Sequence, residues 1–157
     1  MQPKPIRFFI VSAGVILTVT AIAKLVSSFG DARILEIPDP IASLSFRTLF
    51  RMVALLELGV ALVCFFGRRP VLQAALVAWM SVNFLVYRLG LIWVGYHRPC
   101  SCLGNLTDAL HVRPEVADAA MKIVLAYLLA GSFGALAWLW QLRRNIPTPP
   151  GASSVAA

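Results

Sequence analysis

Long uninterrupted apolar runs dominate the pattern of hydrophobic and polar positions along this chain. Four such runs extend over approximately Phe8–Phe29, Leu44–Phe66, Val71–Val94 and Val116–Trp140. Each is long enough to cross the hydrocarbon core of a bilayer, which takes about 20 residues of helix. Because the runs are continuous rather than alternating, they predict helices and not the strands of a membrane barrel. The sequence therefore predicts an all-α integral membrane four-helix bundle.

The composition agrees with a membrane protein. Hydrophobic residues make up 59% of the chain and charged residues only 13%, whereas soluble domains have about 25% charged residues. We predict one four-span domain over residues 1–145 and a disordered Pro-rich tail over residues 146–157. One alternative is that Ala21-Ile22-Ala23 is a signal-peptidase site, in which case three spans would remain. We favour an uncleaved first helix because the apolar run continues past this site.

The basic residues predict an orientation in the membrane. The net charge is +7, and pairs of basic residues flank the runs on one side of a four-helix zigzag: Lys4 and Arg7, Arg68 and Arg69, Arg143 and Arg144. By the positive-inside rule both termini should be cytoplasmic. The segment between the third and fourth runs should then lie on the other side, which is the periplasm for a bacterial inner membrane. This placement favours an orientation signal over nucleic-acid binding.

Two short segments connect the first three runs. Pro38 and Pro40 prevent a continuous helix between the first two runs, and the apolar residues before them predict a lid that lies along the membrane surface. The turn Gly67-Arg68-Arg69-Pro70 is short, so the second and third runs are predicted to be antiparallel neighbours.

Two cysteines, Cys100 and Cys102, lie one residue apart in the segment between the third and fourth runs. Outside the cytosol such a pair tends to be oxidised. A disulfide across one residue closes almost no loop, so it adds little stability, and its strained geometry makes it labile. We therefore predict Cys100 and Cys102 as catalytic residues of thiol–disulfide exchange. His97 would favour the reactive thiolate.

Several charged residues lie within the apolar runs. They are Lys24, Arg51, Glu57, Arg88 and Lys122, and together with Arg47 all but Glu57, which lies near the middle, map to the outer half of their helices. Ionisable groups in a membrane usually face the bundle interior or a wet cavity. We predict a positively charged pocket that supports the Cys pair and would stabilise a thiolate or a reduced quinone. Two alternatives are that Lys24 and Arg47 extend to the outer surface, and that a Glu57–Arg pair only ties helices together.

The four runs, a lysine late in the first, an acid in the second and a Cys-x-Cys-x-Gly loop before the last resemble the MauE branch of the DoxX-like membrane proteins. That branch often has Cys-Gly-Cys-Phe-Gly, where this chain has Cys100-Ser101-Cys102-Leu103-Gly104, and the resemblance extends over about residues 6–141. It implies a redox-associated membrane protein, as in methylamine utilisation, with a thioredoxin-like extracytoplasmic partner. Other DoxX-like proteins are linked to quinone reduction, so a quinone is the candidate cofactor.

A second function stays open from the sequence, and with it whether the protein is an enzyme. The alternative is a non-enzymatic assembly factor or complex subunit whose Cys loop docks a partner or passes a metal. A closed zinc site takes four ligands, for which only His97 and His111 would join the cysteine pair, so no metal site is predicted, although Cu(I) needs fewer ligands. Cys64, near the cytoplasmic end of its run, is predicted as a small buried hydrophobic residue.

Overall fold

The computed structural model describes residues 4–30, 33–36, 38–39, 41–95 and 114–145. In these parts of the chain the structure contains four long helices and one short 3₁₀ helix. They are α1 (Lys4–Ser28), η1 (Arg33–Glu36), α2 (Phe46–Phe66), α3 (Pro70–Trp93) and α5 (Pro114–Arg144). Each long helix has the length and hydropathy of a membrane span. The predicted all-helical fold with four helices of membrane-spanning character is therefore confirmed, and it suggests an integral membrane protein.

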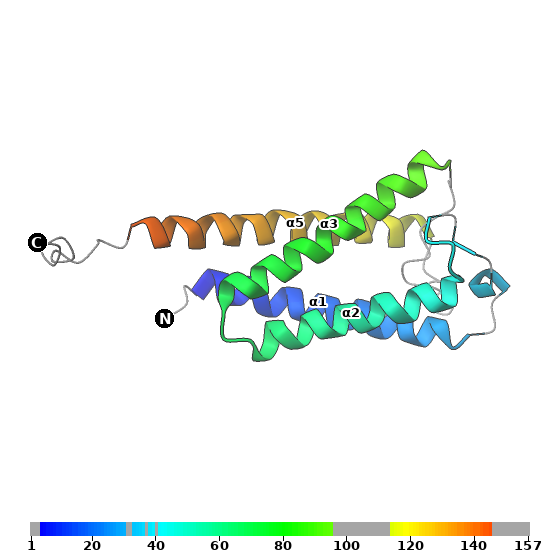
Figure 1. Ribbon diagram of the computed structural model, residues 1–157, viewed down its shortest axis with the longest axis horizontal. Coiled ribbons are helices and arrows are strands. Elements are labelled where there is room, and N and C mark those ends of the chain that lie inside the picture. The colour runs from blue at the N-terminus through cyan, green and yellow to red at the C-terminus, as the bar shows by residue number, and fades with distance from the viewer. Residues whose placement is uncertain (1–3, 31–32, 37, 40, 96–113, 146–157) are drawn as a thin grey trace, which may run out of the picture.

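The four long helices form two closely packed pairs (Figure 1). α1 packs along α2 and α3 packs along α5, whereas the contacts between the pairs are fewer. α3 leaves α2 at the short turn and runs diagonally across the bundle. The second and third spans are thus joined at one end, as the short turn predicts, but each has its main packing partner elsewhere. Described residues near both chain ends lie at one end of the bundle, opposite to the end of α3 and the start of α5.

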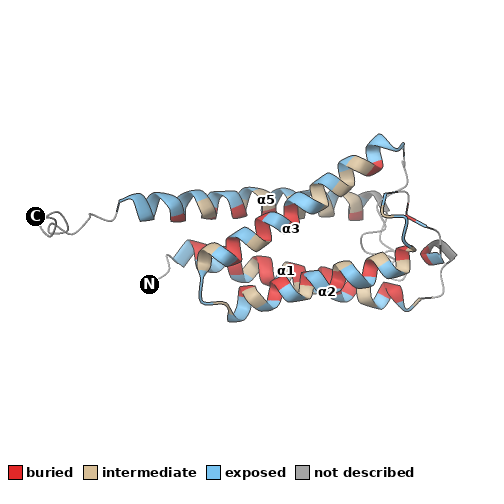
Figure 2. Cartoon of the chain, viewed as in Figure 1, coloured by how far each residue is buried: buried red, intermediate tan, exposed pale blue. Residues whose placement is uncertain are grey.

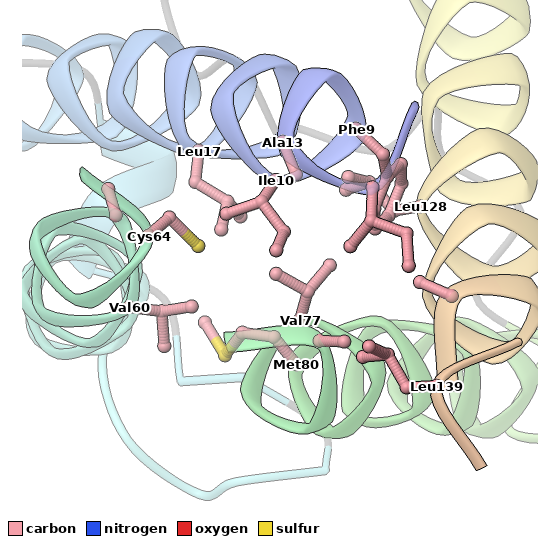
Figure 3. Close-up of a cluster of buried hydrophobic side chains, with 14 residues drawn as sticks. Phe9, Ile10, Ala13, Leu17, Val60, Cys64, Val77, Met80, Leu128 and Leu139 are labelled. Carbon is pink, nitrogen blue, oxygen red and sulfur yellow. The ribbon is translucent and has the colours of Figure 1, made fainter. Parts of the chain in front are cut away.

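Buried apolar side chains from all four long helices meet in one core (Figure 3). They include Phe9, Ile10, Ala13 and Leu17 of α1, Val60 and Cys64 of α2, Val77 and Met80 of α3, and Leu128 and Leu139 of α5. Cys64 is buried in this core, as predicted. The outward faces of the helices are exposed (Figure 2) and carry many large apolar side chains, among them Phe8, Leu55 and Ile123. An apolar exterior of this kind suits a lipid environment.

Close approach of α1 and α5 depends on Gly131. A Cβ atom built there would lie 2.1 Å from Cε2 of Phe9, whereas a Cβ atom at Gly134 would meet nothing within 4 Å. Phe9 also packs its ring against Tyr127, with 5.7 Å between the ring centroids. The absence of a side chain at Gly131 therefore lets the Phe9 ring lie directly on the α5 backbone.

The corner between α2 and α3 is held by Gln73. Its Nε2 atom lies 3.0 Å from the carbonyl oxygens of Val63 and Cys64 and 2.9 Å from that of Gly67. Val63 and Cys64 belong to the last turn of α2 and Gly67 is its C-cap, where few backbone N–H groups remain to pair with the carbonyls. The carbonyl of Val63 also accepts a hydrogen bond from the N–H of Gly67 at 2.8 Å. Pro70 begins α3, a position at which its missing N–H costs nothing. The side chain of Gln73 thus binds the first turn of α3 to the end of α2.

The segment before α2 folds onto the bundle through Asp39, whose side chain is buried. Its Oδ1 accepts hydrogen bonds from the backbone N–H of Ile41 at 2.9 Å and of Ala42 at 2.7 Å. Its Oδ2 accepts a hydrogen bond from the hydroxyl of Tyr87 on α3. Leu35 packs on Phe46 of α2. The described part of this segment is therefore attached to both α2 and α3, and a lid along the membrane surface stays a prediction from the sequence.

We expect Asp39→Ala to loosen this segment. The substitution removes the acceptor of two backbone N–H groups and of the Tyr87 hydroxyl, and an unsatisfied buried donor costs about 1–3 kcal/mol. Hydrogen exchange at the amides of Ile41 and Ala42 should become at least about tenfold faster, the factor that about 1.4 kcal/mol gives. Asp39→Asn keeps an oxygen acceptor and should leave these amides protected. Unchanged protection in Asp39→Ala would contradict the role of this carboxylate.

Candidate functional site

A buried ion pair joins α1 to α2. Nζ of Lys24 lies 2.7 Å from Oε1 of Glu57, and the two side chains are 7% and 1% exposed. The same ammonium lies 5.5 Å from the centroid of the Phe84 ring on α3. Lys24 therefore points into the bundle, and the alternative that it extends to the outer surface is wrong. The partner of Glu57 is this lysine, so the alternative of a Glu57–Arg pair is also wrong.

A cavity of about 70 Å³ adjoins this ion pair. Side chains from all four long helices line it: Ile16, Leu17, Thr20 and Lys24, Glu57, Phe84, Tyr87 and Arg88, and Met121, Val124, Leu125 and Leu128. Most are apolar. Oε2 of Glu57 is buried and has no hydrogen-bond partner among the described residues. The cavity has room for a water molecule, which needs about 10–15 Å³. Such a water could donate a hydrogen bond to Oε2 of Glu57.

A second group of charges links α3 to α5 beside the same cavity. Arg88 forms an ion pair with Asp118, and Nζ of Lys122 lies 2.9 Å from the other carboxylate oxygen of Asp118. Lys122 is 62% exposed and does not line the cavity, whereas Arg88 does. The i,i+4 spacing of Asp118 and Lys122 is visible in the sequence, but the contact with Arg88 depends on how α3 packs on α5.

Arg51 lies apart from both groups. Its Nε lies 3.4 Å from Oγ of Ser28, and its guanidinium carbon lies 5.4 Å from the centroid of the Phe29 ring. The neighbouring Arg47 donates to the carbonyl of Gly30 at 3.3 Å. Cations near a helix C-terminus are favourable because they complement the carbonyl end of the helix dipole. Arg51 therefore stabilises the end of α1 and is not part of the cavity, in contrast to the single pocket that the sequence predicts.

The predicted catalytic residues Cys100 and Cys102, with His97 and His111, lie outside the described residues, as does the predicted tail. The described chain leaves α3 at Gly95 and resumes at Pro114, both at the bundle end that contains Arg88 and Asp118. Cys64 is the one cysteine in the described ranges, and it is free. Among the residues that the structure describes, no three His, Cys, Asp or Glu side chains are grouped as metal ligands.

Sequence reasoning did not single out Asp39 as the residue that attaches the segment before α2 to the bundle. Asp39 stands between Pro38 and Pro40, and its side chain accepts hydrogen bonds from the backbone N–H groups of the residues two and three positions later, which is the pattern of an Asx turn. That local signal was available. Its bond to Tyr87 was not, because it depends on the position of α3.

Comparisons of the chain with protein-family models, with curated protein sequences and with solved structures found no match. The structure defines an all-helical protein of membrane-spanning character with a buried ion pair between α1 and α2 and a partly buried one between α3 and α5. The likeness to the MauE branch of the DoxX-like proteins stays a prediction from the sequence, with the Cys-x-Cys-x-Gly motif as its most specific element.

Proposed function

We propose that this protein is an integral membrane thiol–disulfide redox protein in which Cys100 and Cys102 cycle between a disulfide and a dithiol. The observation that carries the proposal is this cysteine pair, one residue apart, which follows α3 and precedes α5 in the sequence. The described residues support the proposal through the charges at that end of the bundle. Arg88 lies near the end of α3 and forms an ion pair with Asp118 near the start of α5. Charged groups within membrane helices commonly mark functional sites.

The exchange is a two-electron reaction with a soluble thioredoxin-like protein. A thiolate of the partner attacks the Cys100–Cys102 disulfide at the sulfur of Cys100, and Cys102 leaves as a thiolate. The second thiol of the partner then attacks the mixed disulfide and releases Cys100. The partner ends as a disulfide and this chain as a dithiol, with two electrons and two protons transferred. The reverse sequence reduces the partner.

A quinone does not fit the cavity beside Lys24 and Glu57 as the structure shows it. The cavity volume is about 70 Å³, whereas an apolar cavity that binds benzene has about 150 Å³. A quinone ring, which is larger than benzene, would need α3 or α5 to move. We therefore assign no electron-transfer step to this cavity, and a quinone remains a prediction from the sequence.

Thiol labelling tests the proposal and the orientation together. We expect a membrane-impermeant maleimide to label Cys100 and Cys102 in intact bacterial cells only after reductant, because the pair is oxidised on the periplasmic side. Buried Cys64 should react only after denaturation and serves as the internal reference. Cys102→Ser should trap a mixed disulfide with the partner through Cys100. The matched variant Cys64→Ser should keep the reducible pair.

No reducible pair under any condition, or labelling only after permeabilisation, would contradict the proposal. The alternative is a non-enzymatic assembly factor or subunit, which the Lys24–Glu57 tie between α1 and α2 would serve equally well. Under that alternative a Cys100→Ser, Cys102→Ser double variant would complement a deletion strain fully. If the loop instead passes a metal, the purified wild-type protein would carry stoichiometric metal, and the double variant would lose it.

A further inference from the structure

A second concave site lies at the opposite end of the bundle, between the start of α3 and the end of α5. This cleft has a volume of about 680 Å³. It is lined by Arg68, Arg69, Pro70, Val71, Leu72 and Ala75 on one side, and by Leu139, Leu142 and Arg143 on the other. Its size lies within the range of about 300–1,000 Å³ that is usual for ligand pockets. Neither Arg88 nor Asp118 lines this cleft.

The cleft is positively charged, and no acidic side chain is among its lining residues. Arg68, Arg69 and Arg143 are exposed, and none of them forms an ion pair with an acidic side chain among the described residues. The first turn of α3 has no acidic residue and no side-chain cap. Its free N–H groups add partial positive charge at the same place. Three guanidinium groups around a helix start are thus arranged to hold an anion.

The remaining lining of the cleft is apolar and continues onto the outer faces of the helices. Leu72 is 50% exposed and Leu142 is 44% exposed, and Val71 lies between Leu72 and the arginines in sequence. Inorganic phosphate would satisfy the arginines but would leave these side chains uncovered. A ligand that covers both parts has an anionic head and a hydrocarbon tail.

We propose that this cleft binds one anionic phospholipid. Its phosphate lies against Arg68, Arg69 and Arg143, and an acyl chain lies along Leu72 and Leu142. Basic pockets between membrane helices recognise anionic head groups, and each Lys or Arg near the membrane surface contributes about 1 kcal/mol of attraction. Arginine also presents paired N–H donors that match phosphate oxygens.

Arg144 provides a matched control. It is the next residue after Arg143, but its guanidinium carbon lies 3.6 Å from the centroid of the Trp140 ring, and it does not line the cleft. Arg143→Gln and Arg144→Gln change the net charge equally, at adjacent positions on the last turn of the same helix. A difference between the two variants therefore reports the site and not the overall charge.

Native mass spectrometry of the full-length protein in neutral detergent tests the proposal. The protein is incubated with equal amounts of phosphatidylglycerol and phosphatidylcholine, and the bound lipid is counted. We expect wild type to retain one phosphatidylglycerol in preference to phosphatidylcholine. Arg143→Gln should weaken this retention about fivefold, the factor that about 1 kcal/mol gives, and Arg68→Gln with Arg143→Gln should weaken it further. Arg144→Gln should match wild type.

Three results would overturn the proposal. The first is equal loss of phosphatidylglycerol in Arg143→Gln and Arg144→Gln, which would show attraction to net charge alone. The second is equal retention of the two lipids by wild type. The third is displacement of the lipid by millimolar inorganic phosphate, which would assign the cleft to a free anion. Thermal unfolding of each variant, which should match wild type, separates lost binding from lost folding.

Discussion

Replacing Glu57 by leucine is expected to destabilise the protein by about 3–5 kcal/mol, the cost of removing one partner from a buried ion pair. The substitution leaves the Lys24 ammonium 7% exposed, without the carboxylate that lies 2.7 Å from it in the wild type. The surrounding side chains are mostly apolar, so little else can solvate the charge. Unfolding of the purified protein in mixed micelles, followed by circular dichroism, measures the change.

The double variant Lys24→Met, Glu57→Leu is the control for this prediction. It removes both charges and keeps similar volumes, so it should recover most of the lost stability. Lys122→Met removes a cation that is 62% exposed and should cost less than about 1 kcal/mol. If the double variant were as unstable as Glu57→Leu alone, then a stranded charge would not be the cause.

Gly131→Ala is expected to destabilise the protein by about 1–3 kcal/mol through overpacking. The new methyl group would lie 2.1 Å from Cε2 and 2.6 Å from Cδ2 of Phe9. The Phe9 ring has little room to withdraw, because it belongs to the central core and packs on Tyr127. α1 and α5 must therefore separate or the ring must leave its place. The same unfolding measurement reports the loss.

Gly134→Ala provides the opposite expectation on the same helix. Nothing lies within 4 Å of a Cβ atom at Gly134, and alanine is better than glycine in a helix by about 1 kcal/mol. This variant should be neutral or slightly more stable. Equal effects of the two substitutions would show that helix propensity, and not contact with Phe9, decides the outcome at Gly131.

The helices were predictable because their length and hydropathy alone define them. Their ends were less so, since α1 begins at Lys4 and α5 continues to Arg144, past the apolar runs. Polar and basic residues at these ends are compatible with a helix, so hydropathy does not show at which of them the helix begins or ends. The pairing of α3 with α5 was not predictable either, because a run that is apolar on all sides does not show which face meets a neighbour.

The charge pairs illustrate the same limit. The sequence predicts Lys24, Arg51 and Arg88 in the outer half of their helices, which stays a prediction because it depends on the orientation in the membrane. It could not assign their partners, because these depend on helix rotation and on the offset between neighbouring helices. Arg51 meets Ser28 and Lys24 meets Glu57 only through the register of α1 against α2. An i,i+4 pair such as Asp118 and Lys122 needs no such knowledge.

The hydrogen bonds of Gln73 to the carbonyls at the end of α2 hold the angle at which α3 leaves α2. Because α3 is long, a small change in this angle displaces its far end by much more. At a rise of about 1.5 Å per residue, the 24 residues of α3 span roughly 36 Å. A rotation of about 10° at the corner would thus carry the Trp93 end sideways by about 6 Å at this length. The spacing around Arg88 and Tyr87 therefore depends on the angle at this corner as well as on the contacts that α3 makes with α5 and Asp39. A small change in that angle would be magnified where the cavity lies.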